Sequence, residues 1–398
     1  MPRYPVLSSW IESMPTSVFE SLKLRAQNYP GPIVPFHVGD THLDPPLMAR
    51  LGMQGFTGES APDLYKYSPA HGDTSFLDAI LNKLAVDNGM DWVTPDNVQI
   101  TMGATHGLSS CVRTALDPGE QILLLTPHWP LMRGIALSCG LQPVEVPFSH
   151  VLMRDAQASV EELLESYITP ETAAIYFANP NNPDGKVYTR EELSAIAKVA
   201  QKHNLWVIAD EVYEKFVYDG DFCSIATLPG MSERTLTVFS FSKTYGLPGL
   251  RVGYLVGPTR VMLGARKMTN HTVYNVPRAM QQSAMAAITH GQEWVDQARE
   301  LYIKHRDLAH ELIVAPCVKP EGATYLFLDL SQYCADDAES SVCVLERLVD
   351  AGMLLTPGGA FGQHYRKWAR LCFTSLSYDE LEESLVRLNR VLEDGECK

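Results

Sequence analysis

The sequence has little that would direct the chain to a membrane, to nucleic acid or to a metal. No apolar run approaches the roughly 20 residues that a helix needs to cross a bilayer. The 47 acidic residues outnumber the 32 basic ones, and a formal net charge of −15 repels phosphate backbones, so nucleic acid is a poor partner. No two of the 8 cysteines have CxxC spacing, so neither a zinc site nor a disulfide framework is indicated, and reduced thiols are expected.

Two further absences narrow the class of protein. The first ten residues lack a charged segment followed by an apolar one, the pattern of a secretory signal, so a cytoplasmic location is expected. There is no internal repeat and no low-complexity tract. What is present is ordinary for a globular enzyme, with 45% hydrophobic and 20% charged residues. A chain of 398 residues is too long for one ordinary core and indicates either a large and a small domain or a large domain with appendages.

The centre of the chain alternates short apolar runs with stretches of helical spacing, which predicts an α/β domain with a mostly parallel sheet flanked by helices. Thr189 and Glu192 have the spacing of a capping box at the start of one helix. We expect strands at Val98–Met102, Gln121–Thr126, Thr172–Ala178, Leu205–Asp210, Thr235–Ser240 and Gly253–Val256, and helices at Ser159–Tyr167 and Thr189–Asn204.

The C-terminal part predicts a second, smaller α+β domain. A long helical pattern from Val276 to Leu312 leads into it, and the Pro-rich first forty-odd residues are expected to be irregular and to pack on it. The strands expected there are Thr324–Leu330, Met353–Thr356 and Arg370–Thr374, with helices at Ser341–Ala351 and Tyr378–Leu392. The predicted division is an N-terminal segment at 1–45, a large domain at 46–290 and a small domain at 291–398.

Polar residues follow three of the predicted strands. Asp210 ends one strand, Ser240 ends another, and Asn182 follows a third after a short loop. Ligands of parallel sheets bind at the carboxyl ends of the strands, so these side chains are expected to meet at one edge. Taken alone, Asp210 is equally consistent with a helix cap, and the Asn182 segment (NPNNPDG) with an ordinary turn, although its two X-Pro bonds make a cis peptide an option.

Lys243 lies just past a predicted strand, between hydroxyl residues and before a turn rich in glycine and proline. A lysine on its own is more often a solvated surface charge. Lysine is also the residue that forms Schiff bases with carbonyl groups, and Arg251 with the nearby serines are group types that bind a phosphate dianion. The segment is neither a Walker loop nor a GxGxxG turn. A carboxylate such as Asp210 is the partner that a pyridine nitrogen needs, and Tyr213 supplies a hydroxyl.

Together the segments around Asn182, Asp210 and Lys243 resemble those of the fold-type I pyridoxal phosphate (PLP) enzymes of the aminotransferase class I/II family. The resemblance extends over about Pro35 to Leu392. The resemblance implies PLP as the cofactor, a large PLP-binding domain with a smaller α+β domain, and no metal. It also implies a homodimer with shared active sites that moves an amino group between an L-amino acid and a 2-oxo acid.

The resemblance also assigns roles residue by residue. Lys243 resembles the lysine of the internal aldimine and Asp210 the partner of the pyridinium nitrogen. The other residues are assigned as follows: Tyr213 and Asn182 beside the ring hydroxyl, Ser240, Arg251 and the backbone of Gly103, Ala104 and Thr105 at the phosphate, Trp129 stacked on the ring, Tyr67 at the phosphate of the neighbouring subunit, and Gly39, Asn182 and Arg370 at the substrate, with Arg370 on its α-carboxylate.

Three functions remain open at this point. The same cofactor residues serve aminotransferases and PLP-dependent lyases or cyclases, since the fate of the carbanion depends on the side-chain pocket. A non-catalytic PLP-binding regulatory module is the third. No arginine that would select a dicarboxylic substrate stands in Asn270–Asn275, and Arg278 shortly after is equally consistent with a surface charge.

Overall fold

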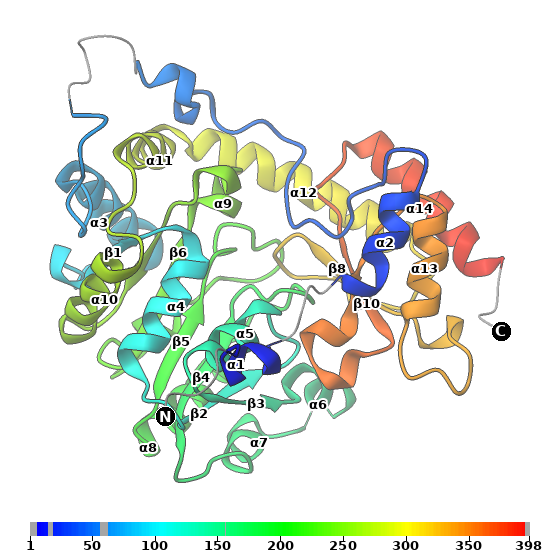
Figure 1. Cartoon of the computed structure of the whole chain (residues 1–398), viewed down its shortest axis with the longest axis horizontal. Coiled ribbons are helices and arrows are strands. Elements are labelled where there is room, and N and C mark those ends of the chain that lie inside the picture. Colours follow the sequence, from blue (N-terminus) through cyan, green and yellow to red (C-terminus); the bar gives the residue numbers. More distant parts are fainter. Residues whose placement is uncertain (1–5, 15–18, 56–62, 156, 395–398) are drawn as a thin grey trace.

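The computed structural model describes residues 6–14, 19–55, 63–155 and 157–394. Two sheets lie in these ranges, each with its own helices (Figure 1). The larger has seven strands in the order β1-β7-β6-β5-β4-β2-β3, and the smaller has three in the order β8-β10-β9.

The larger sheet is parallel except for one strand. Strands β2 to β6 pair in parallel, while β7 runs antiparallel to both of its neighbours, β6 and β1. The prediction of a mostly parallel sheet is therefore confirmed. The strands are β1 (Val98–Thr101), β2 (Gln121–Leu125), β3 (Gln142–Val146), β4 (Thr172–Ala178), β5 (Trp206–Asp210), β6 (Thr235–Ser240) and β7 (Gly253–Val256).

Helices bury both faces of this sheet, which is why most residues of its inner strands are buried and apolar. Alternate residues of β2 show the two faces: Ile122 and Leu124 lie in one core, Leu123 and Leu125 in another. The helices of this part are α3 (Thr74–Asn88), α4 (Gly103–Ala115), α5 (Leu131–Ser138), α6 (Phe148–Arg154), α7 (Val160–Glu165), α8 (Arg190–Lys202), α9 (Phe241–Thr244), α10 (Thr259–Thr272) and α11 (Arg278–His290). The capping box of Thr189 and Glu192 opens α8 as predicted.

The smaller sheet is antiparallel and consists of β8 (Tyr325–Asp329), β9 (Thr356–Pro357) and β10 (Trp368–Cys372). Helices α13 (Val342–Asp350) and α14 (Tyr378–Glu393) pack with it in a single core. Helix α12 (Gln292–Leu312) runs from α11 to α14 and so connects the two sheets (Figure 1).

The helical pattern from Val276 to Leu312 is confirmed, as two successive helices that meet at Gly291, where a Cβ atom would lie 2.4 Å from the carbonyl oxygen of Ala287. Two other local predictions were wrong. The expected strand at Met353–Thr356 begins only at Thr356, and Met353 instead forms an isolated bridge with Val34. Cys343 is disulfide-bonded, so the expectation of reduced thiols fails there, although six other cysteines are free.

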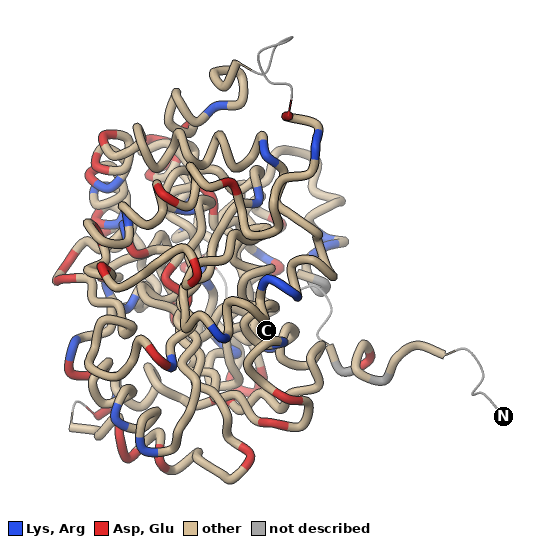
Figure 2. Tube along the Cα trace, turned by 90° about the vertical axis from the view of Figure 1, so that its left-hand side faces the viewer, with Lys and Arg blue, Asp and Glu red and all other residues tan. Residues whose placement is uncertain are grey.

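The N-terminal part is less irregular than predicted, because it contains α1 (Ser9–Ser13) and α2 (Glu20–Asn28). Helix α2 packs against α13, and Leu22 lies in the core of the smaller sheet. Helix α1 contacts α5 of the larger part, and the described residues 6–14 project from the body in Figure 2. The division at residues 45 and 290 stays a prediction.

Charged residues of both signs are interspersed along the chain, as Figure 2 shows for one side. The net charge of −15 is therefore spread out rather than gathered in one segment. Within the described ranges, no helix combines the length and the apolar character that a membrane crossing requires.

Candidate active site

A cavity of about 230 Å³ opens at the carboxyl ends of β4, β5 and β6. The smaller sheet closes it from the other side through Tyr325 of β8 and Arg370 of β10. The residues that the sequence predicted for a site and that line this cavity are Gly39, Ala104, Thr105, Trp129, Asn182, Asp210, Tyr213, Ser240, Lys243, Arg251 and Arg370.

Lys243 lies in the short helix α9 that begins directly after β6. Ser240 caps this helix, since its Oγ accepts a hydrogen bond of 3.1 Å from the backbone N–H of Ser242. The Lys243 ammonium donates to the carbonyl oxygen of Gly39, so the amine is held in the cavity. Gly39 must be glycine, because a Cβ atom there would lie 1.9 Å from the hydroxyl of Tyr325.

Asp210 is the last residue of β5 and is 5% exposed. Its Oδ2 accepts a hydrogen bond of 3.1 Å from the Tyr176 hydroxyl, while its Oδ1 is buried and has no partner among the described residues. Burial raises the pKa of this carboxyl to about 7, although the Tyr176 hydroxyl, the backbone N–H of Val212 and the charge of Lys243 act in the other direction. A buried carboxylate with a free oxygen needs a cationic or donating partner from outside the chain.

The raised pKa of Asp210 predicts how the stability of the cofactor-free protein changes with pH. Between its ordinary pKa of 3.8 and about 7, the folded state binds a proton that the unfolded state does not. The wild type should therefore lose up to about 4 kcal/mol relative to Asp210→Asn as the pH rises from about 4 to about 7, and no more above that. Denaturant unfolding of both proteins at about pH 5 and pH 8 measures this difference. A wild type that gains stability over the variant across this range contradicts the assignment.

The N-terminus of α4 and the residues after β6 form a cradle for an anion. Gly103, Ala104 and Thr105 begin α4, where free N–H groups and the helix dipole favour negative charge. Arg251 lies against this turn, since a Cβ atom on Gly103 would be 2.6 Å from its Nη2. Arg251 adopts a left-handed backbone conformation with φ of 54° and donates to the carbonyl oxygen of Pro248 at 2.9 Å. The cradle suits a phosphate dianion.

Arg370 is the third cation of the cavity and is 7% exposed. It donates to Asn182 Oδ1 at 2.9 Å and to the carbonyl oxygen of His37 at 2.7 Å. Its guanidinium lies over the ring of Tyr325, 4.2 Å from the centroid, and its buried Nε has no partner among the described residues. Such a fixed, incompletely satisfied guanidinium suits a carboxylate ligand.

Two loops that carry site residues are tied together. Each follows a strand and contains a cis X-Pro bond, at Thr126–Pro127 before Trp129 and at Asn179–Pro180 before Asn182. The side chain of Asn181 joins them by donating to the carbonyl oxygen of Pro127 at 2.9 Å.

Tyr325 was not predicted from the sequence as a site residue. Its hydroxyl is hydrogen-bonded to that of Tyr213 at 2.5 Å, and the guanidinium of Arg370 lies over its ring. Burial and the nearby Tyr325 hydroxyl raise the pKa of Tyr213, so it is a neutral donor at physiological pH. Tyr325 stands in a plain apolar strand and has no motif around it; the only signal is a tyrosine at the start of a predicted strand.

Two predicted site residues do not line this cavity: Gly103, which adjoins it at the start of α4, and Tyr67. Tyr67 is 78% exposed and packs against the ring of Tyr274, with 4.8 Å between centroids. Among the described residues there is also no group of three or more histidine, cysteine or acidic side chains that could hold a metal ion. The cavity thus combines a binding site for a dianion at α4 and Arg251, a carboxylate-binding guanidinium at Arg370, the amine of Lys243 and the buried carboxyl of Asp210. These cations come together on a chain whose net charge is negative.

Comparisons with known proteins agree with this arrangement. The family profile described as "Aminotransferase class I and II" matches residues 33–388. The chain is 32% identical to the aromatic-amino-acid aminotransferase 2 of Thermococcus litoralis over 397 residues, 98% of each protein. It is 30% identical to the aspartate/prephenate aminotransferase of Thermus thermophilus over 94% of each. The solved aspartate aminotransferase from Thermus thermophilus with maleate superposes with a TM-score of 0.87 at 29% identity, covering 98% of this chain and 100% of that one.

Proposed function

We propose, from the premise that this chain belongs to the aminotransferase class I and II family, that it holds PLP on Lys243 and moves amino groups between L-amino acids and 2-oxo acids. The family and the relatives make the chain an aminotransferase, and the family depends on PLP in general. The observation that carries the proposal is the cavity in which Lys243, Asp210, Arg251 and Arg370 come together.

The residues of the cavity fit PLP by their chemistry. The start of α4 with Ser240 and Arg251 would hold the phosphate, and the unpartnered Oδ1 of Asp210 would accept from a protonated ring nitrogen. Tyr213 and Asn182 would donate to the ring hydroxyl, and Trp129 would cover one face of the ring. When bound, PLP supplies a ring that withdraws the electrons left at a substrate α-carbon after its proton departs.

The chain's own groups then perform the remaining work. Arg370 binds the α-carboxylate in a bidentate pair and so fixes which bond of the α-carbon faces Lys243. The Lys243 amine would remove the proton from the substrate α-carbon and would deliver it to C4′ of the cofactor. One group would thus serve as general base and then as general acid. Asp210 remains ionised beside a cation, because an adjacent positive charge lowers the pKa that burial raises. Gly39 leaves room for the hydroxyl of Tyr325, and its carbonyl oxygen holds the Lys243 amine in the cavity.

The relatives favour transamination over elimination or cyclisation, since those compared above are all named as aminotransferases. Their names include both aromatic amino acids and aspartate, so the proposed substrates are amino acids and 2-oxo acids as a class. We also propose a homodimer with shared active sites. The exposed Tyr67 supports it, because a tyrosine that is 78% exposed and lies away from its own cavity is free to serve a neighbouring one.

The reaction class is tested by giving the PLP-loaded protein single amino acids without an oxo acid. We expect the corresponding 2-oxo acid to form and to stop at one equivalent per Lys243, because the amino group stays on the enzyme until an acceptor takes it. Mass analysis of products and an ammonia assay measure this. Continued turnover without acceptor, with release of ammonia or a cyclic product, would show a lyase or cyclase instead.

A further inference from the structure

The segment that carries Tyr67 has an exposed outer side and a tightly bonded inner side. Tyr65 and Tyr67 are 93% and 78% exposed, which is unusual for aromatic side chains and typical of a surface that meets another chain. Ser68, directly after Tyr67, is buried at 4% exposure. The buried Ser68 therefore anchors the segment, while the neighbouring Tyr67 side chain faces solvent.

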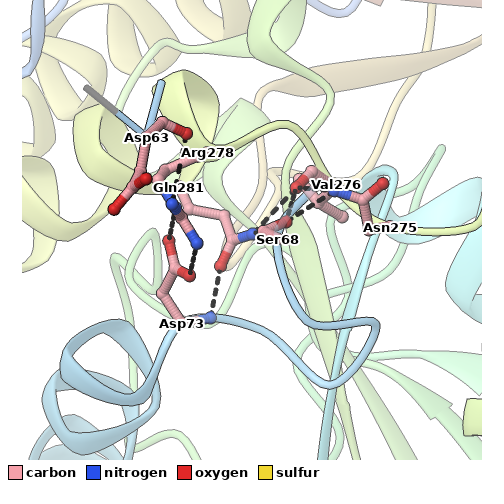
Figure 3. A network of polar contacts seen from close by, with 7 residues as sticks. All are labelled: Asp63, Ser68, Asp73, Asn275, Val276, Arg278 and Gln281. Atoms are coloured by element: carbon pink, nitrogen blue, oxygen red, sulfur yellow. Dashed lines mark hydrogen bonds and ion pairs between the residues drawn. The ribbon is translucent and has the colours of Figure 1, made fainter. Parts of the chain in front are cut away.

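Ser68 is fixed by a polar cluster at the start of α11. Its Oγ donates to the carbonyl oxygen of Val276 at 2.7 Å and accepts from Asn275 Nδ2 at 2.6 Å and from Gln281 Nε2 at 3.1 Å (Figure 3). Tyr274, on which the Tyr67 ring packs, immediately precedes Asn275. One cluster thus holds both members of the Tyr67–Tyr274 pair.

Gln281 extends the same cluster to the end of the segment. It is 1% exposed, its Nε2 donates to Val276 O at 2.8 Å, and its Oε1 accepts from the backbone N–H of Asp73 at 2.8 Å. A buried amide with each end bonded to a different point of the chain fixes the distance between those points. In Figure 3 it lies between Ser68 and Asp73.

Arg278 binds both ends of the segment. Its Nε and Nη2 donate to the two carboxylate oxygens of Asp73 at 3.1 and 3.2 Å, and its Nη1 donates to the carbonyl oxygen of Asp63 at 3.2 Å. Arg278 and Asp73 are each 20% exposed, so Arg278 is not a free surface charge. A cation at the first position of α11 interacts unfavourably with the helix dipole, so Arg278 does not stabilise its own helix by its charge. Its hydrogen bonds instead stabilise the segment from Asp63 to Asp73.

We propose that Arg278 and Gln281 are positioning residues for the cofactor site of the partner subunit. They fix residues 63–73 so that the Tyr67 hydroxyl reaches the phosphate held by the partner. This inference rests on the proposed function, which supplies the cofactor and the shared site. A cluster outside the cavity of one chain thereby sets the cofactor affinity of the other chain.

The test uses hybrid dimers in which only one subunit can link PLP to Lys243. In the first hybrid, one chain carries Lys243→Ala and Arg278→Met together and the other is wild type, so the competent cavity receives the altered segment. In the second, one chain carries Lys243→Ala and the other Arg278→Met, so the competent cavity receives an intact segment. PLP is titrated, fixed with borohydride and quantified on the Lys243 peptide.

We expect the first hybrid to bind PLP about tenfold to a hundredfold more weakly than a hybrid in which one chain carries Lys243→Ala alone. This is the loss of affinity expected when one hydrogen bond to a charged group, here from the Tyr67 hydroxyl to the phosphate, is removed. The second hybrid should bind normally. Adding Tyr67→Phe to the Lys243→Ala chain should reproduce the first result. Equal weakening of both hybrids, weakening of the second alone, or no weakening would overturn the inference.

Two controls separate positioning from loss of folding. Lys186→Met removes an ion pair between Lys186 and Glu192, whose side chains are 23% and 16% exposed and so are buried to a similar extent as Arg278 and Asp73. Hybrids that carry Lys186→Met in place of Arg278→Met should bind PLP normally. Arg278→Lys keeps the charge without the planar fork and should give an intermediate effect in the first hybrid only. A wild-type protein that takes up no PLP would refute the proposed PLP chemistry. One that binds PLP as a monomer would refute the shared active site and this inference, but not the proposed reaction.

Discussion

Lys243→Ala is expected to lower turnover by at least about 10⁴-fold, because one substitution removes both the covalent anchor of the cofactor and the group that moves the α-proton. The fold should survive, since the hydrogen bond that the ammonium donates within the described residues goes to the carbonyl oxygen of Gly39, at the edge of the cavity. PLP should still bind without a covalent link, because the phosphate cradle around Arg251 and α4 is untouched. Steady-state kinetics, PLP titration and thermal unfolding measure the three effects.

Lys243→Arg is the matched variant for this prediction. It keeps a positive charge that can still reach Gly39, but a guanidinium neither links to a carbonyl group nor gives up its proton at physiological pH. It should be as inactive as the alanine variant. Turnover within tenfold of the wild type for either protein is not compatible with the role of Lys243.

Asp210→Asn is expected to bind PLP and yet to lower turnover by about 10²–10⁴-fold, the range associated with one proton-transfer group. A neutral amide cannot hold a proton on the ring nitrogen, so the ring withdraws electrons from the α-carbon less strongly. The unpartnered Oδ1 of Asp210 is the reason to expect a direct contact with the ring. Single-turnover kinetics with an α-deuterated amino acid measure whether loss of the α-proton has become the slow step.

Glu211 provides the matched control, because it is the next residue, is fully buried and has a pKa that burial raises strongly. It does not line the cavity, and its Oε1 accepts a hydrogen bond of 2.7 Å from Ser224. Glu211→Gln should therefore keep turnover near that of the wild type. Equal losses in the two variants would mean that any buried carboxyl at this sheet edge matters and that Asp210 has no special role.

Six of the seven strands of the larger sheet were predictable, because burial on both faces leaves a mainly apolar run. Strand β3 was not predicted, because Gln142, Pro143 and Glu145 interrupt its apolar residues. Thr172–Ala178, Thr235–Ser240 and Gly253–Val256 have the predicted bounds in the structure. Asp210 and Ser240 stand at the ends of such runs, and the rule that parallel strands end at one edge then brings them together. The site was thus mostly predictable from residues adjacent to strands.

What the sequence did not predict depends on partners that are distant in the chain. Arg278 was equally consistent with a surface charge, because Asp73, which binds its guanidinium, lies 205 residues away. Tyr325 gave no signal for the same reason, since its partners Tyr213 and Arg370 belong to other elements. Helix α2 was missed because its periodicity is weak and its contact with α13 supplies the stability.

The most direct test of the account is to find which lysine holds the cofactor. The protein is loaded with PLP and reduced with borohydride, and the peptides are mapped by mass spectrometry. We predict one phosphopyridoxyl group per chain, on Lys243. Lys83 is the informative competitor, because it is buried and burial lowers its pKa, but it is paired with Glu214 and does not line the cavity. Label on Lys83 or another lysine, or no label on a protein that has been offered PLP, would contradict the account.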